Sequence, residues 1–539
     1  MFKQPLTQTE IEEEIRRIMC GEDSEPDPFE DSGSDWEEDN LEPEPEDSDD
    51  ESDDDNIVIA PETPVCIPQR NLFQDPPTAA REQTPAEGGE SETNILEVCS
   101  SLHQYLIKPN KTSLTGKNGH KWSAKVPAKC KRTAARNIIH FIPGLKGNTN
   151  NYSMFDEYFL HFFSNDILDI ILQHTNAEIA RRAQKYQSHA NISEITKNEL
   201  KALFAILIMS AANKDNHLSM KHMFNTNISG KFYRACMSGE RFFFLLNCLR
   251  FDNKETRQER VLKDPLAHIR EIWDIFITTC RSSYTPSSYL TIDEQLVGFR
   301  GRCPFKIYIP NKPSKYGIKI VMLCDSSSKY MIDADPYLGK LTKRNGLPLA
   351  SYYVKELTKS VHGSNRNVTM DNWFTSVPLA DELLKDPYKL TILGTLRKNK
   401  KEIPTELLNV KGRNPNTSMF CYDRQKTLLS YMPKRQKIVL LLSTLHEGAE
   451  ITATGKPAII QNYNQTKGGV DTFDQMCSNM NSCRKTRRWP MVIFYDMINI
   501  GSINSYAIYS INTLNMNKKP LSRYQFDYDR ISDDLDQPI

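Results

Sequence analysis

The sequence predicts a mixed α/β protein behind a disordered acidic tail, and three observations support this prediction. From about Asn150 to Ser283, apolar residues recur with helical spacing. At Ser288 the spacing changes to the alternation of apolar and polar residues that is typical of strands. Near Asn367 a short strand runs into a helix, which adds a strand–helix unit to the strands before it.

The first region in chain order is an acidic tail, residues 1–100. Residues 22–55 are built mainly from Asp, Glu, Ser and Pro, so they have too little apolar surface to offset the entropy of ordering. Four serines lie among acidic residues, a setting that acidophilic kinases favour: Ser32, Ser34, Ser48 and Ser52. We therefore expect a disordered tail with a kinase or other proteins as partners.

The helical region follows a basic connector. Phe155–His174 has apolar residues at helical spacing, and Thr196 with Glu199 forms a capping box before the apolar run Leu200–Met209. Glu240–Phe251 and Pro265–Cys280 are two further predicted helices. One face of the last segment is apolar and is expected in a helical core: Leu266, Ile269, Trp273, Phe276 and Cys280.

Strands dominate after Ser288. The predicted strands are Tyr289–Leu296, Phe305–Ile309, Ile318–Cys324, Lys329–Asp333 and Asn367–Met370. A helix is expected near Ser376, with Pro378 in its first turn.

The next segment, up to about Lys456, is rich in turns and resembles an insertion. It contains the predicted strands Thr427–Tyr431 and Ile438–Ser443. Helical spacing resumes at Gln465 and continues through Tyr509.

The charge of the chain is strongly segregated although its net charge is −1. Residues 1–100 hold 31 acidic and 5 basic side chains, and the rest of the chain holds 38 acidic and 63 basic ones. A basic body favours a polyanionic partner such as nucleic acid, for which the tail would compete. The charge pattern alone also fits a solubilising tail on an ordinary basic protein.

Several classes of protein are excluded by composition. Of the twelve cysteines, the closest pair is Cys477 and Cys483, and this spacing predicts no zinc site. The longest apolar stretches, near Ala202–Ala212 and Ile438–Leu442, are too short to span a bilayer. The N-terminus carries no signal peptide pattern, so we expect a soluble intracellular protein with free thiols and no membrane partner.

Three aspartates lie where an apolar or tightly turning segment ends: Asp293, Asp371 and Asp471. Asp474 follows one helical turn after Asp471, and Gly468 and Gly469 before it permit close approach of the backbone. If they converge, their oxygens would suit divalent cations and phosphoryl chemistry on nucleic acid. Taken singly, each aspartate also fits an ordinary cap or turn residue.

Four blocks of sequence resemble the piggyBac transposases, and the resemblance spans about Lys108 to Tyr509. The blocks are Leu290–Lys319, Met370–Ser376, Tyr463–Asp474 and Arg484–Pro490. Several long blocks in a fixed order make this resemblance specific.

The resemblance implies an RNase H-like catalytic core with an inserted β-rich domain and a flanking helical domain for dimerisation and DNA binding. The domains expected are an acidic tail at 1–100, a basic connector at 101–141, a helical domain at 142–288 and 481–515, a catalytic domain at 289–397 and 458–480, an insertion at 398–457 and an acidic C-terminal tail at 516–539.

The resemblance also implies a function. Asp293, Asp371 and Asp471 would bind two Mg²⁺ ions, which Mn²⁺ can replace, and Asp474 would be a fourth catalytic acid. The implied reaction is cut-and-paste transposition at TTAA sites through a hairpin intermediate. It would be carried out by a homodimer on double-stranded DNA in the nucleus.

Two basic segments are expected to contact DNA, because cationic side chains neutralise phosphates and aromatic rings stack on bases. The candidates are Arg300, Arg302, Lys306, Lys312, Lys315 and Lys319 in the first segment, and Arg484, Lys485, Arg487, Arg488 and Trp489 in the second. The first segment also fits an exposed strand face with ordinary lysines. Trp489 fits equally well as the anchor of the helix that follows it.

The family usually ends in a cysteine-rich zinc-binding domain, whereas no cysteine follows Cys483 here and the last residues are acidic. Recognition of transposon ends is therefore the part of the function that the resemblance supports least. Two alternatives stay open: a domesticated, non-catalytic DNA-binding protein, and a protein that acts through its acidic tail with the core as a scaffold.

Overall fold

The structure is a computed structural model that describes residues 105–128, 132–183, 192–227, 230–310, 312–342, 344 and 346–528. All of these residues belong to one compact unit. The predictions of a disordered tail at 1–100, of its kinase sites and of its partners lie outside the described residues, as do residues 529–539. Among the described residues, no helix has the length and apolar character needed to cross a bilayer.

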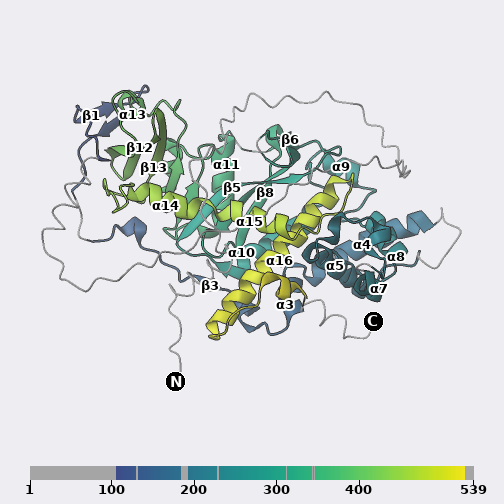
Figure 1. Cartoon of the computed structure of the whole chain (residues 1–539). Coiled ribbons are helices and arrows are strands. Elements are labelled where there is room, and N and C mark those ends of the chain that lie inside the picture. Colours follow the sequence, from purple (N-terminus) through teal and green to yellow (C-terminus); the bar gives the residue numbers. More distant parts are fainter. Residues whose placement is uncertain are drawn as a thin grey trace, which may run out of the picture. The chain divides into compact units, whose positions relative to one another are not determined.

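A mixed sheet organises the fold, and helices gather beside it (Figure 1). Its described strands follow the order β1-β2-β11-β12-β13-β10-β9-β5-β7-β6, with β8 paired to β7. The strands of this sheet are β1 Ser113–Thr115, β2 Lys121–Ser123, β5 Tyr289–Gly298, β6 Lys306–Tyr308, β7 Tyr316–Asp325, β8 Met331–Pro336, β9 Asn367–Met370, β10 Thr391–Thr395, β11 Thr417–Asp423, β12 Lys426–Lys434 and β13 Lys437–Ser443. A separate pair consists of β3 Gly144–Leu145 and β4 Tyr284–Thr285.

The centre of the sheet has the order β8-β7-β5-β9-β10. Strands β5, β9 and β10 run parallel, whereas β7 and β8 are antiparallel to their neighbours. Nearly all residues of β7 and β9 are buried, on both faces of the sheet, which shows that both faces are covered here. The predicted strands are confirmed, with ends that coincide or shift by up to three residues.

The helices before the sheet are α3 Phe155–Phe162, α4 Asn165–Ala183, α5 Lys197–Ala212, α6 Met220–Met223, α7 Gly230–Cys236, α8 Gly239–Cys248, α9 Arg257–Val261 and α10 Arg270–Ser283. Those that follow are α11 Leu349–Leu357, α12 Val377–Leu383, α13 Thr405–Leu408, α14 Ala458–Lys467, α15 Gly469–Asn479 and α16 Trp489–Asn515.

The helical core forms around α16, which is buried along nearly its whole length. Phe494 of α16 packs against aromatic rings from the region of α3 and α5. Its ring centroid lies 5.6 Å from that of Phe204 in α5. The predicted capping box of α5 is confirmed, because Thr196 accepts a hydrogen bond from the backbone N–H of Glu199. The apolar residues predicted on one face from Leu266 to Cys280 are also buried, although α10 begins only at Arg270, five residues after the predicted start.

The helical segment predicted from Gln465 to Tyr509 needs correction. Helix α14 begins earlier, at Ala458, and residues 481–488 are not helical. This break falls where polar Asn481 and Ser482 hydrogen-bond to Asn499 of α16 rather than continue a helix.

The basic connector forms part of the sheet where it is described. Strands β1 and β2 pair with each other, and β2 pairs with β11 through Ser123 and Tyr422. Trp122 is 1% exposed and its indole N–H donates to the carbonyl of Glu402 at 2.8 Å. One large buried ring therefore fastens the connector to the inserted segment.

The start of the predicted acidic C-terminal tail is also folded. Residues 523–528 are helical, and Phe526 is fully buried against Tyr509 of α16, with ring centroids 4.8 Å apart. Asp527 is buried too and accepts a hydrogen bond from Ser502. Asp527 therefore serves as an internal hydrogen-bond acceptor within an acidic segment.

Candidate active site

The central strands bring two of the predicted acids together. In the parallel pair of β5 and β9, Ile292 is aligned with Met370, so Asp293 and Asp371 follow aligned residues on adjacent strands. Asp293 continues β5, whereas Asp371 leaves β9 in a turn that leads to α12. One oxygen of Asp371 accepts from the backbone N–H groups of Trp373 and Phe374, at 2.9 and 3.4 Å. This turn fixes the Asp371 carboxylate beside the end of β9.

Helix α15 carries the other two acids over β5. A Cβ on Gly469 would lie 2.4 Å from Oγ1 of Thr291, so only glycine allows the helix to start this close to the strand. Hydroxyl groups hold the preceding turn: Thr291 donates to the carbonyl of Thr466 at 2.6 Å, and Thr369 lies 2.7 Å from the Thr466 hydroxyl. Asp471 in the first turn of α15 also lies at the end of a helix that favours negative charge.

The electrostatics show that these carboxyl groups interact. Burial raises the pKa of Asp293 well above its usual value, and Glu294, Asp471 and Asp371 raise it further. Burial and Glu294 raise the pKa of Asp371 to about 6. Burial raises the pKa of Asp474, and the nearby Asp471 carboxylate raises it further. The site therefore concentrates negative charge that its own cations do not fully balance.

Two lysines of the predicted DNA-binding set lie in this acidic region. Burial alone would lower the pKa of Lys312, but it is raised by the surrounding carboxylates of Glu294, Asp293, Asp471 and Asp474. Lys319 lies 3.6 Å from Glu294, is 7% exposed and stands over the ring of Trp373 at 4.4 Å. Both lysines balance the acids, and the burial of Lys319 does not support its prediction as a phosphate contact.

The acids fit a divalent cation for two reasons. They raise one another's pKa, so the site has too little positive charge to neutralise them. Their carboxylate oxygens are also the hard ligands that Mg²⁺ prefers. The acids do not yet form a complete metal site, however. In the described part of the chain, no three His, Cys, Asp or Glu side chains already stand close enough together to hold a metal ion.

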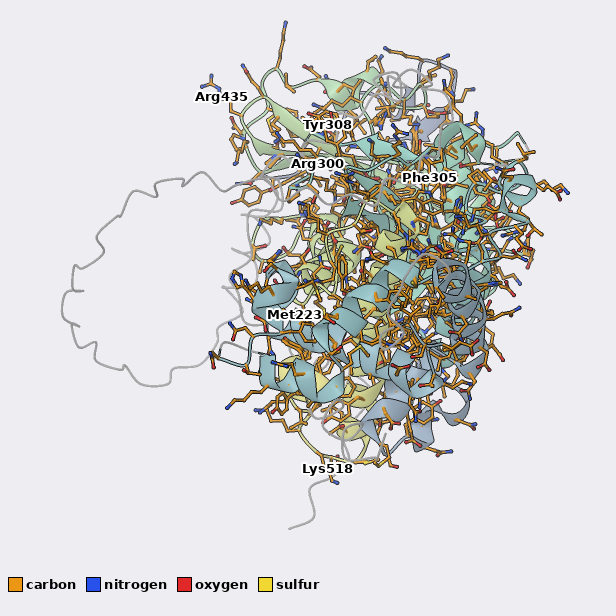
Figure 2. The ribbon with its side chains drawn as sticks, turned by 90° about the vertical axis from the view of Figure 1, so that its right-hand side faces the viewer. Met223, Arg300, Phe305, Tyr308, Arg435 and Lys518 are labelled. Carbon is orange, nitrogen blue, oxygen red and sulfur yellow. The ribbon has the colours of Figure 1, made fainter. Side chains whose placement is uncertain are left out.

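Exposed basic residues surround the loop after β5. Arg300 and Arg302 are exposed in this loop, Lys306 is half-buried on β6, and Lys315 is exposed before β7. The rings of Tyr308 and Tyr316 are both exposed and lie 4.7 Å apart. Figure 2 labels Arg300, Phe305 and Tyr308 in the same part of the molecule.

The second basic segment lies against the first. A Cβ on Gly301 would lie 2.8 Å from the carbonyl oxygen of Arg487, so the two backbones are in close contact. Lys485 and Arg487 are exposed there. Two segments that are far apart in sequence therefore form one basic surface.

Two arginines of the predicted DNA-binding set are internal and must be reassigned. Arg484 is 8% exposed and donates to the carbonyls of Asp215, Asn216 and Leu218. Arg488 donates to three carbonyls at the end of α8: Leu246, Asn247 and Leu249. Burial lowers the pKa of Arg488 to about 9. Backbone carbonyls occupy both guanidinium groups, so neither remains a candidate for phosphate contact in this conformation.

The sequence allowed two roles for Trp489, a contact with DNA or an anchor for the following helix. The structure favours the anchor. It is 7% exposed and packs edge-on against Phe305 at 5.0 Å and His268 at 4.9 Å. This contact joins the start of α16 to the loop that precedes β6.

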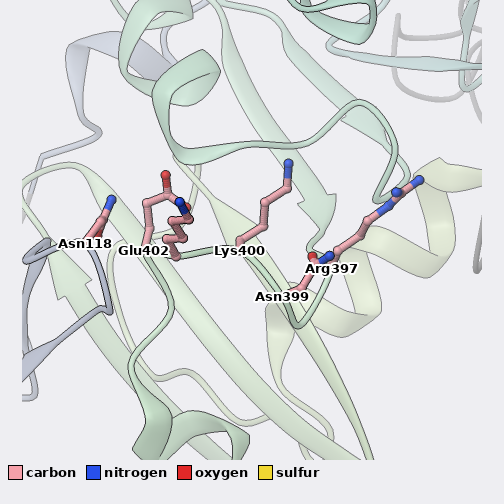
Figure 3. A pocket seen from close by; sticks show the side chains of 6 residues that line it. Asn118, Arg397, Asn399, Lys400 and Glu402 are labelled. Carbon is pink, nitrogen blue, oxygen red and sulfur yellow. The ribbon is translucent and has the colours of Figure 1, made fainter. Parts of the chain in front are cut away.

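The structure adds site residues that the sequence reasoning missed. Arg397 donates to Asn372, the neighbour of Asp371, at 3.2 Å, and its Nη2 atom is buried without a hydrogen-bond partner. It lines a pocket of about 340 Å³ with Asn118, Asn399, Lys400, Lys401 and Glu402 (Figure 3). Tyr463 is buried beside the acids, and burial together with Asp371 raises its pKa. In the sequence, the pocket is marked by the basic residues Lys398, Lys400 and Lys401.

Comparison with known proteins places the chain among transposases. A family model described as Transposase IS4 matches residues 156–506. A cryo-EM structure of a piggyBac transposase synaptic complex with hairpin DNA is 50% identical in sequence, with a TM-score of 0.72; the match covers 73% of this chain and 83% of that one.

Two curated human relatives are more distant. PiggyBac transposable element-derived protein 3 is 22% identical over 363 residues, which cover 62% of this chain and 58% of that protein. The chimeric ERCC6-PGBD3 protein shows the same identity over the same share of this chain and 33% of its own length. The chain thus spans less than two thirds of either human relative.

Proposed function

This chain belongs to the piggyBac family of DDE transposases, and from that premise we propose that it cleaves and rejoins DNA strands by metal-dependent phosphoryl transfer. The observation that carries the proposal is that Asp293 and Asp371 directly follow the aligned residues Ile292 and Met370 of the parallel neighbours β5 and β9. Asp471 on α15 raises the pKa of Asp293 and of Asp474. The strand order β8-β7-β5-β9-β10 supports the finer assignment of this core as RNase H-like.

Asp293, Asp371 and Asp471 would hold Mg²⁺, with Mn²⁺ as an alternative ion. When bound, two such ions supply charge stabilisation for the attacking and leaving oxygens of a phosphodiester. The chain itself fixes the Asp371 carboxylate through two backbone N–H groups, which leaves its other oxygen available. Lys312 balances part of the acid charge.

The exposed basic surface is the proposed path of the DNA backbone. Its members are Arg300, Arg302, Lys306, Lys315, Lys485 and Arg487. We extend the proposed DNA path toward the acids through Arg397 and Lys400. Both residues line the pocket, and Arg397 donates a hydrogen bond to Asn372. Cationic side chains around a site for phosphoryl transfer lower the cost of bringing a second polyanion close.

The remaining features of the proposal follow family membership. We propose TTAA as the target, a hairpin on the transposon end as the intermediate, a homodimer as the active form and the nucleus as the location. The related structure, a synaptic complex with hairpin DNA, supports the intermediate and the DNA partner.

The test is a nicking assay with the full-length protein, Mg²⁺ and a plasmid that carries family-type transposon ends bounded by TTAA. We expect nicking by the wild type and none by Asp293→Asn, because the amide replaces a charged ligand with a neutral one. Asp386→Asn is the matched control, since that carboxylate is exposed and pairs only with Lys389 at the surface.

Equal nicking by Asp293→Asn and the wild type would contradict the proposal. Salt-sensitive DNA binding without cleavage under Mg²⁺ or Mn²⁺ would favour a domesticated DNA-binding protein instead.

A further inference from the structure

Lys319 is a buried cation that lies against two aromatic rings. It lies on β7 opposite Leu296 of β5 and is 7% exposed. Its ammonium group is 4.4 Å from the ring centroid of Trp373 and 5.3 Å from that of Tyr337. The centroids of these two rings are 6.2 Å apart, so both rings pack around one cation. Attraction between a cation and an aromatic ring is strongest where water is excluded, as it is around this buried side chain.

The same ammonium group reaches the strand that carries Asp293. Lys319 Nζ lies 3.6 Å from Glu294 Oε2, and the backbone N–H of Glu294 donates to the Asp293 carboxylate at 2.8 Å. Successive side chains of a strand point to opposite faces, so Glu294 and Asp293 leave β5 on different sides. Lys319 is therefore joined to β5 on the face opposite to the Asp293 carboxylate.

Trp373 connects the lysine to the second acid. Its backbone N–H donates to the Asp371 carboxylate at 2.9 Å, and that of Phe374 adds a bond of 3.4 Å. These bonds are local to the turn after β9. The indole ring, in contrast, contacts a side chain of β7, which lies on the far side of β5 from β9. This contact joins the turn of Asp371 to the sheet.

The position of the lysine is fixed from its other side by Tyr337. This residue directly follows β8, is 5% exposed, and donates its backbone N–H to the carbonyl of Lys319 at 2.8 Å. Its ring stacks on that of Tyr353, with centroids 5.9 Å apart. A lysine stem is flexible in solution, and a buried enclosure of this kind restricts it to few rotamers.

We infer that Lys319 is a positioning residue, which fixes the turn of Asp371 relative to the strand of Asp293 and so sets the spacing of two proposed metal ligands. This inference rests on the metal-dependent function proposed above. Lys319 acts through Glu294 and Trp373, the neighbours of the two acids. A role limited to charge balance would have the opposite consequence for metal binding, because a nearby ammonium group repels a divalent cation.

The test measures Mn²⁺ binding by the full-length protein without DNA, from the loss of the electron paramagnetic resonance signal of the free ion. Lys319→Met keeps the apolar stem and removes the ammonium group. It should weaken Mn²⁺ binding by about 10- to 100-fold, as the loss of a residue that orients a metal ligand typically does.

Lys312→Met is the matched control for charge. Lys312 lies among the same acids and donates to the backbone carbonyl of Glu294 at 3.3 Å. Its replacement removes the same positive charge but leaves the contact between Lys319 and Trp373 in place. We therefore expect Lys312→Met to tighten Mn²⁺ binding, whereas Lys319→Met weakens it.

Trp373→Leu breaks the same contact from the other side, while both lysines keep their charge. It should weaken Mn²⁺ binding within the same range and cause little further loss in a double variant with Lys319→Met, since the two residues act as a unit. Lys319→Arg should recover most of the loss, because a guanidinium group also stacks on aromatic faces. Thermal unfolding midpoints check folding, and Trp373→Leu decides the test if Lys319→Met does not fold.

The outcomes separate this inference from the proposed function. Unchanged or tighter Mn²⁺ binding by Lys319→Met and Trp373→Leu, with binding by the wild type, would overturn the positioning role alone. A wild type that binds no Mn²⁺ would overturn the proposed metal site and this inference together. If Mn²⁺ binding changes as expected but the wild type does not nick DNA, the proposed cleavage is wrong and the positioning role stands.

Discussion

Single buried acids show how strongly the environment sets protonation in this protein. On β8, Asp333 accepts two hydrogen bonds from Arg281, at 2.5 and 2.7 Å, yet burial still raises its pKa to about 6. Asp335 is raised to about 7 by burial, with Asp333, Asp274 and Glu356 adding to the effect and Arg270 opposing it. These acids lie outside the proposed active site, so a raised pKa alone does not identify a catalytic residue here.

We predict that Asp335→Asn stabilises the protein at pH 8 and changes its stability little at pH 4. A folded-state pKa of about 7 exceeds the unfolded value, so the folded state binds more protons between the two values. Wild-type stability therefore falls as pH rises from about 4 to about 7, by at most roughly 4 kcal/mol for this group. Thermal unfolding midpoints at both pH values check the prediction.

The control for this measurement is Asp169→Asn, which removes a carboxylate that is 61% exposed and pairs with Lys197. It should behave like the wild type at both pH values. A lower midpoint for Asp335→Asn than for the wild type at pH 8 would show that the ionised carboxylate is stabilising.

At the scale of elements, helix ends decide which basic residues remain free for a partner. The last carbonyls of α8 have no partner within the helix, and Arg488 at the start of α16 supplies donors to them. Arg250 donates to two of the same carbonyls, those of Asn247 and Leu249. Arg487, one residue earlier, is exposed. Adjacent arginines thus have opposite roles.

We predict that Arg488→Ala and Arg487→Ala separate stability from DNA binding. Arg488→Ala removes a donor from three carbonyls, of which those of Asn247 and Leu249 keep Arg250, and should destabilise the protein by about 1 to 3 kcal/mol. Arg487→Ala should leave stability unchanged and reduce the slope of log affinity against log salt by about 1. Thermal unfolding and DNA titrations at several salt concentrations measure both effects. A fully stable Arg488→Ala protein with weakened DNA binding would restore Arg488 as a DNA contact.

At the scale of the whole molecule, the charge is divided between the first 100 residues and the rest. The first part carries 31 acidic and 5 basic side chains, and the proposed DNA path on the body is basic. Because both a polyanionic tail and DNA are attracted to the same cations, we propose that they compete for this surface.

We predict that deletion of residues 1–100 tightens DNA binding at about 50 mM salt and has a much smaller effect at about 200 mM, where such attraction is screened. Competitive titration of one labelled duplex against both proteins provides the measurement. A tail of equal length with its acids changed to Asn and Gln serves as the control, and it should bind like the deletion. Equal affinities of the wild type and the deletion at low salt would rule out competition.

Much of the fold was readable from local patterns. The shift from helical to alternating spacing at Ser288, the strand Asn367–Met370 and the capping box at Thr196 all describe interactions between near neighbours, and each is confirmed. The same holds for Gly469, whose close approach to Thr291 follows the glycine pair that the sequence displays. The spacing of apolar residues and the backbone freedom of glycine are properties of a single segment. They can therefore be recognised without knowledge of the fold.

What the sequence left open depends on contacts between distant segments. The burial of Arg484, Arg488 and Lys319 and the incorporation of the connector through Trp122 follow from partners more than 20 residues away. Composition describes these residues only as basic or aromatic, whereas a basic side chain binds phosphate or a buried carbonyl according to its surroundings. The sequence by itself determined most of the strands around Asp293 and Asp371 and the candidate acids. Only the tertiary structure decided which charges face inward, because desolvation depends on every neighbour in space.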